Sequence, residues 1–189
     1  MAIAESCPLI HEISLGEMSK EKRHRCKISD VSIVALASRC TRLLDVTLGS
    51  NHITEVSFKA LARYASCLRT LNVRCRITDV GLIAIGEQCP QLHTLDLDSP
   101  FVTDDGIAAL SGMVELNIHH NSYVTAFAIA QLVIRSPDLE WFDTYDCRLW
   151  YPGEGRHELV RLLHEHLPNP EQSHPRILQF LPALTPREQ

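Results

Sequence analysis

The chain has 189 residues, of which 45% are hydrophobic and 22% are charged, and its formal net charge at pH 7 is −5. This is the composition of an ordinary globular protein, and its acidic balance argues against a nucleic-acid partner, which would call for a basic excess. No apolar stretch reaches the roughly 18 residues that a membrane span requires, and residues 1–6 lack the charged-then-apolar plan of a signal peptide.

A strand pattern recurs along the chain. Its copies start at Ile10, Leu43, Leu68, Leu92, Met113 and Leu139. In the first five copies, apolar residues follow three and five positions later, whereas in the sixth only Phe142 is clearly apolar and Thr144 stands at the next site. Because successive side chains of a strand point to opposite faces, this spacing predicts six short parallel strands with their apolar residues directed inward, the sixth strand being degenerate.

A turn phrase, Ile-Thr-Asp in its clearest form, separates these strands. Its copies start at Ile28, Ile53, Ile77, Val102 and Val124, in steps of 25, 24, 25 and 22 residues. The second residues of the phrase are Ser29, Thr54, Thr78, Thr103 and Thr125. Each suits a helix N-cap, because its side-chain oxygen can accept from an unpaired backbone N–H. Asp30, Asp79 and Asp104, one residue further on, would favour the positive helix end.

Each repeat therefore reads strand, turn, capped helix and return. A unit that cannot bury its own apolar face must stack on copies of itself, and a period of 22 to 25 residues lies within the range of leucine-rich repeats. We predict an α/β fold for residues 1–150: a leucine-rich-repeat solenoid, or horseshoe, with about six short parallel strands and helices on the outside.

One repeat is short. The step from Val102 to Met113 is four residues shorter than the corresponding step in other copies, which is about one helical turn. We expect a shortened helix after Val102 and a local change of curvature. The alternative is that Gly112 ends this helix early, without functional meaning.

Both ends depart from the repeat. Residues 17–27 form a basic insertion, which is either a contact for an acidic partner or nucleic acid, or a solvated loop. Residues 151–189 are predicted to form a capping helix, with apolar residues at helical spacing between Arg156 and Leu167, and a proline-rich tail. An apolar patch in this tail, residues 177–184, either packs on the capping helix or is a partner-binding peptide.

The seven cysteines include no CxxC pair, and most stand at positions set by the repeat. We interpret them as small buried thiols, which fits a cytoplasmic or nuclear protein. The pattern Cys-Pro-x-Leu-x-x-Leu-x-Leu at Cys89–Leu97, together with turns such as Cys75–Asp79 and Cys26–Asp30, resembles the repeats of F-box/leucine-rich-repeat proteins. It is also similar to the related antagonist-of-mitotic-exit family. The resemblance covers residues 7 to about 147.

This resemblance implies substrate recognition for an SCF-type ubiquitin ligase, with SCF subunits as partners. In such proteins an F-box docks the adaptor, and the repeats bind the protein to be ubiquitinated. Here the first repeat begins near Cys7, leaving no room upstream for a three-helix F-box. On this resemblance we expect either a fragment or isoform of a longer receptor, or a repeat-only relative. The alternative function is a free-standing scaffold or inhibitor without a ubiquitin-ligase role.

The outward strand residues predict a protein-binding concave face. Its rows are Glu12, Asp45, Thr70, Thr94, Glu115 and Trp141; Ser14, Thr47, Asn72, Asp96, Asn117 and Asp143; and Gly16, Gly49, Arg74, Asp98, His119 and Tyr145. The candidate binding residues are Asp45, Thr70, Asn72, Arg74, Thr94, Asp96, Asp98, Glu115, Asn117, His119, Trp141, Asp143 and Tyr145. Six acidic residues against one arginine favour a partner with a basic segment, and the two aromatic residues suit an anchor. The alternative is that these polar residues merely keep the face hydrated.

Catalytic patterns are incomplete in this sequence. His157-Glu158 begins like a zinc-protease helix, but Arg161 stands where the second histidine ligand would be. His164 and His166 would lie on nearly opposite faces of a helix. A cation cage of Asp96, Asp98, Asp104 and Asp105 is possible in principle, but strand and capping positions explain these residues more simply. We expect no enzyme activity, no metal and no cofactor.

Overall fold

The computed structural model describes residues 9–16, 28–50, 52–144 and 154–167. Within them the fold is α/β, with one parallel sheet of six strands and with six helices. The strands are β1 (Glu12–Gly16), β2 (Asp45–Gly49), β3 (Thr70–Val73), β4 (Thr94–Asp98), β5 (Glu115–His119) and β6 (Trp141–Asp143). The helices are α2 (Asp30–Arg39), α3 (Glu55–Tyr64), α4 (Asp79–Gln88), α5 (Asp104–Ala108), α6 (Ala126–Ile134) and α7 (Glu154–His166).

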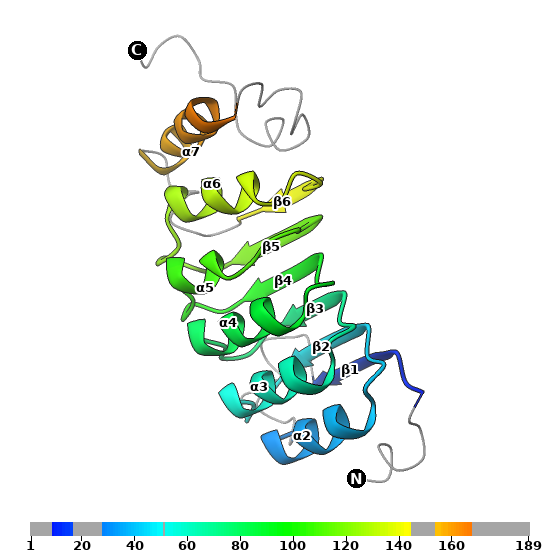
Figure 1. Cartoon of the computed structure of the whole chain (residues 1–189). Helices are drawn as coiled ribbons and strands as arrows, with labels where there is room; N and C mark the ends of the chain where they lie inside the picture. Colours follow the sequence, from blue (N-terminus) through cyan, green and yellow to red (C-terminus); the bar gives the residue numbers. More distant parts are fainter. Residues whose placement is uncertain (1–8, 17–27, 51, 145–153, 168–189) are drawn as a thin grey trace.

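Every strand pairs with the next one in the sequence, so the sheet order is β1-β2-β3-β4-β5-β6. The helices stand in one row along one face of this sheet, each packed against the next from α2 to α7 (Figure 1). Inward strand residues such as Leu71, Leu95 and Leu116 are fully buried between the two layers. The result is a regular β-α array with a single continuous core.

The predicted strand register is confirmed for the described strands. In the first row, Glu12 pairs with Asp45 and the pairing continues strand by strand to Trp141; the second row runs in the same way from Ser14 to Asp143. The sixth strand has only three residues, as its degenerate pattern predicts. Tyr145, placed in the third row by the sequence, lies outside the described residues.

All five predicted cap residues stand at helix N-caps. The hydroxyl oxygens of Thr54, Thr103 and Thr125 accept hydrogen bonds from backbone N–H groups of the first turn. The prediction of side-chain capping is wrong for Ser29 and Thr78, whose hydroxyl oxygens accept no hydrogen bond from the first turn of their helices. The Thr78 hydroxyl is instead used as a donor to Glu55 of the preceding repeat.

The shortened helix is confirmed, since α5 has five residues whereas α2, α3, α4 and α6 have nine or ten. It ends at Ala108, before Gly112 is reached. Gly112 has a φ of 65° and donates its N–H to the carbonyl of Arg135. Its left-handed conformation, which glycine adopts without steric cost, therefore belongs to the turn that leads into β5.

Helix α7 packs on α6 beyond the last strand and buries Leu159, Leu162 and Leu163. This agrees with the predicted helix at the C-terminal end of the repeats. The basic insertion at 17–27 and the tail patch at 177–184 lie outside the described residues.

The interpretation of the cysteines as buried thiols is confirmed for Cys40, Cys75 and Cys89, which are buried, whereas Cys67 is half-buried. The Cys89 thiol donates to the carbonyl of Ala65 at 3.5 Å. Burial raises the pKa of Cys89 to about 11. Cys7 and Cys26 lie outside the described residues.

Candidate protein-binding surface

The sheet face turned away from the helices, called here the open sheet face, carries twelve of the thirteen predicted binding residues. Glu115 and Trp141 are exposed there, and Asp98 is buried, with only 9% of its surface exposed. The half-buried residues are Asp45, Thr70, Asn72, Arg74, Thr94, Asp96, Asn117, His119 and Asp143. The parallel register brings these side chains into adjacent rows that cross all six strands.

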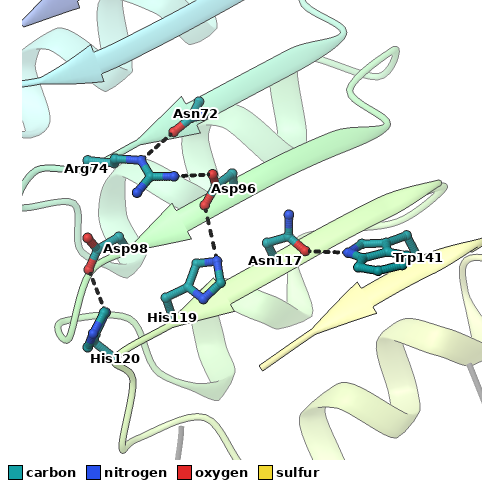
Figure 2. A network of polar contacts seen from close by, with 8 residues as sticks. All are labelled: Asn72, Arg74, Asp96, Asp98, Asn117, His119, His120 and Trp141. Atoms are coloured by element: carbon teal, nitrogen blue, oxygen red, sulfur yellow. Dashed lines mark hydrogen bonds and ion pairs between the residues drawn. The ribbon is translucent and has the colours of Figure 1, made fainter. Parts of the chain in front are cut away.

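Arg74 organises the centre of the open sheet face (Figure 2). Its Nε donates to Asn72 Oδ1 at 3.3 Å, and its Nη2 donates to Asp96 Oδ2 at 2.8 Å. On the other side of Asp96, His119 Nε2 lies 3.7 Å from Oδ1, an oxygen that has no hydrogen-bond partner in the described part of the chain. The guanidinium therefore fixes side chains from two strands and compensates the charge of Asp96.

Asp98 is held in a second contact, which the sequence did not predict. Its Oδ1 lies 3.1 Å from Nδ1 of His120, and this imidazole is half-buried (Figure 2). His120 has a φ of 52°, a left-handed conformation that is uncommon for a residue with a Cβ. Compared with the loops after β2 and β4, the loop after β5 contains one additional residue, and this is His120, directly before the buried Asn121. The spacing of the repeat therefore assigned no role to His120.

These contacts change the predicted electrostatics. Counting residues gives six acids against one arginine, but Arg74 offsets Asp96, and Asp98 is buried against His120. The other four acids, Glu12, Asp45, Glu115 and Asp143, lie toward the two ends of the face and form no ion pair within the described residues. The open sheet face is thus polar and internally paired at its centre, with its unpaired negative charge at the ends.

Trp141 lies at the β6 end of this face and is 44% exposed. Its Nε1 donates to Asn117 Oδ1 at 3.0 Å (Figure 2). Glu115 is its register partner on β5. The indole is consequently held in one orientation while much of its surface faces solvent, which is the arrangement expected of a preorganised aromatic contact residue.

A separate row of carboxylates runs along the helix starts, and we call it the carboxylate ladder: Asp30, Glu55, Asp79 and Asp104. Each is the first residue of its helix and accepts both the backbone N–H and the hydroxyl of the threonine that caps the next helix, at 2.7–2.9 Å. The sequence assigned three of these acids only to the positive end of their own helix. They also join successive repeats.

The positions that receive the ladder carboxylates carry small residues. Ser57 donates its hydroxyl to Asp30 at 2.6 Å, and Gly106 donates its backbone N–H to Asp79 at 3.1 Å. At the equivalent Gly81, an added Cβ would collide with the Glu55 carboxylate. Burial opposes ionisation of Asp30, but the hydrogen bonds from Ser57 and Thr54 outweigh it and lower the pKa of Asp30.

Among the described residues, no group of three or more His, Cys, Asp or Glu side chains is placed to hold a metal ion. None of the described helices has the length and apolar character needed to cross a membrane. In comparisons with known proteins, no family model and no curated protein sequence matches this chain.

Proposed function

We propose that this chain is a protein–protein interaction module, a leucine-rich-repeat solenoid that binds a protein on the open sheet face as its concave face. The observation that carries the proposal is the unbroken register of six parallel strands, which presents side chains in rows across the whole sheet. A broad array of this kind suits an extended protein surface better than a small molecule, which needs a concave apolar pocket.

The side chains on this face define the chemistry of the partner. Trp141 supplies an oriented aromatic contact, and Glu115 and Asp143 add negative charge beside it. Asp45 adds another carboxylate on β2. A protein with Lys or Arg residues at its edges and polar groups opposite the Arg74 network would complement this face. Such charges at the rim raise the association rate and the specificity more than the affinity.

We further propose that the target is presented to an SCF-type ubiquitin ligase in the cytoplasm or nucleus. The support is the resemblance of Cys89–Leu97 and its turn phrases to the repeats of F-box/leucine-rich-repeat proteins. The competing function is a free-standing scaffold or inhibitor.

The test is affinity purification of the tagged full chain from its own cells, with quantitative mass spectrometry. The wild type is compared with Glu115→Lys/Trp141→Ser on the open sheet face and with Glu87→Lys, an exposed charge reversal on α4. Asp96 and Asp98 are avoided because their contacts stabilise the face. A target lost only from the Glu115→Lys/Trp141→Ser sample supports the proposed surface, and equal recovery by all three proteins contradicts it. Co-purification of an SCF adaptor and cullin supports the ligase role, whereas a target without them supports the scaffold.

A further inference from the structure

Exposed apolar side chains gather on an edge that is distinct from the open sheet face. Eight large hydrophobic residues are exposed in the described part of the chain, and six of them lie between a strand end and the first turn of the following helix. We call these six the apolar edge: Val31, Val56, Val80, Phe101, Tyr123 and Phe127. Single exposed apolar residues are normal on a protein surface, but such a concentration on one edge marks an interaction site.

The repeat itself aligns this edge. Val31, Val56, Val80 and Phe127 are the second residues of α2, α3, α4 and α6. The three valines directly follow ladder carboxylates, and each rung of the ladder ties one helix start to the next. The apolar row therefore runs beside the row of carboxylates. Phe101 and Tyr123 extend it in the loops before α5 and α6.

The negative charge along this edge is not compensated within the described residues. The carboxylates of the ladder accept only from neutral hydroxyl and backbone N–H groups. Asp105, the second residue of α5, adds an exposed carboxylate in the same row. Two described basic residues directly precede the turn phrases of this edge, His52 and Arg76. The guanidinium of Arg76 lies 4.5 Å from the centre of the Phe101 ring. This contrasts with the open sheet face, where Arg74 pairs with Asp96.

We propose that the apolar edge and the carboxylate ladder together form a second protein-binding surface, whose occupant is a basic amphipathic helix of a partner protein. An apolar stripe bordered by lysine or arginine side chains would match a valine and aromatic row bordered by carboxylates. Neighbouring helices pack roughly 8–10 Å apart, so the row over five helices extends about 30–40 Å. A helix of about 24 residues has that length, at 1.5 Å per residue.

The proposal does not depend on binding at the open sheet face, and the test separates the two surfaces. The probe is a synthetic, fluorescently labelled helical peptide of about 24 residues with a leucine stripe and lysines elsewhere. The comparison peptide has glutamates in place of the lysines. Binding to the full chain is measured by fluorescence anisotropy at low and high salt. We expect the lysine peptide to bind, with an affinity that falls as salt rises, and the glutamate peptide not to bind.

Variants of the chain then locate the binding site. Val56→Ser/Val80→Ser/Phe127→Ser removes three exposed apolar groups and should weaken binding about tenfold or more. Asp105→Lys should weaken it about threefold or more by repulsion. The matched control, Trp141→Ser on the open sheet face, should leave the affinity unchanged. Circular dichroism shows whether each variant is folded. If the triple variant is unfolded, Asp105→Lys still tests the apolar edge.

Three outcomes would overturn the proposal. The first is failure of the lysine peptide to bind, and the second is equal binding of both peptides. The third is weakening by Trp141→Ser but not by the variants of the apolar edge, which would assign the peptide to the open sheet face. If the lysine peptide fails to bind, self-association of the chain is the remaining measurement. Self-association that the triple variant abolishes would identify a second copy of the chain as the occupant instead.

Discussion

The carboxylate of Asp79 accepts hydrogen bonds from both the backbone N–H and the hydroxyl of Thr103, each at 2.8 Å and across 24 residues of sequence. Thr103 is the N-cap of α5, and it also accepts a bond from the N–H of Asp105. One threonine is therefore both donor to the preceding repeat and acceptor for its own helix. The side-chain caps of α3, α5 and α6 are thus coupled to the packing of successive repeats.

Removal of a ladder carboxylate should lower the stability of the whole array. Asp79→Ala removes the acceptor for three donors, two from Thr103 and one from Gly106, so we expect the free energy of unfolding to fall by about 2 kcal/mol. Urea denaturation measures this change. Asp105→Ala is the matched control on the next helix, and it should cost about 0.5 kcal/mol or less because its carboxylate takes no part in the ladder. Equal losses for the two variants would contradict the structural role of the ladder.

Stability should fall in acid partly through Asp30. Because its pKa in the folded chain is below the ordinary value of 3.8, the folded chain binds fewer protons than the unfolded chain as the pH drops past that value. The stability that Asp30 contributes is therefore present above 3.8 and is lost as the pH falls through the lowered pKa. Ser57→Ala, which deletes one donor to Asp30, should cost about 1 kcal/mol at pH 7 and progressively less in acid.

Two measurements check this linkage. NMR titration of the Asp30 carboxyl carbon should show its pKa rising toward the ordinary value in Ser57→Ala, and urea unfolding at several pH values gives the stability difference. Ser38→Ala, which removes an exposed hydroxyl bonded only within its own helix, serves as the control and should leave the Asp30 titration unchanged. A pH-independent destabilisation by Ser57→Ala would show that Ser57 acts through packing alone.

The strand register was predictable because it depends on local spacing. Apolar residues three and five positions after Leu68 or Leu92 can be directed inward together only in one strand alignment. The shortened α5 was predictable for the same reason, since a deletion of four residues removes about one turn. Both predictions use distances within a single repeat, which are visible in the sequence.

The pairing of charges was not predictable in this way. Arg74, directly after β3, and Asp96 of β4 belong to different rows, and their contact depends on side-chain direction as well as register. Sequence counting therefore overstated the negative charge of the open sheet face. The ladder had a signal that could have revealed it: Ser57, Gly81 and Gly106 occupy the same position of the turn phrase. Small residues recurring there indicate a close approach by a neighbouring group.

Gly86 should be intolerant of a side chain, although it lies inside α4. Alanine at a helix position normally stabilises by about 0.5–1 kcal/mol relative to glycine, but a Cβ at Gly86 would collide with the carbonyl oxygen of Ala109 at the end of α5. We expect Gly86→Ala to destabilise by about 1–3 kcal/mol in urea unfolding. Glu87→Ala, an exposed change one residue along the same helix, should not destabilise. A stabilising Gly86→Ala would mean that α5 shifts readily away from α4.

The described cysteines should differ sharply in reactivity. The thiolate is the reactive form, and a pKa of about 11 for the buried Cys89 leaves about one thiol in a thousand ionised at pH 8. We expect iodoacetamide at pH 8 to alkylate the half-buried Cys67 of the native chain well before Cys40, Cys75 or Cys89, as followed by peptide mass spectrometry. In denaturing urea, where burial is lost, the four rates should converge. Alkylation of Cys89 at the rate of Cys67 in the native chain would show that the α4 end of the core opens without global unfolding, because only exposure of the thiol restores its ordinary ionisation.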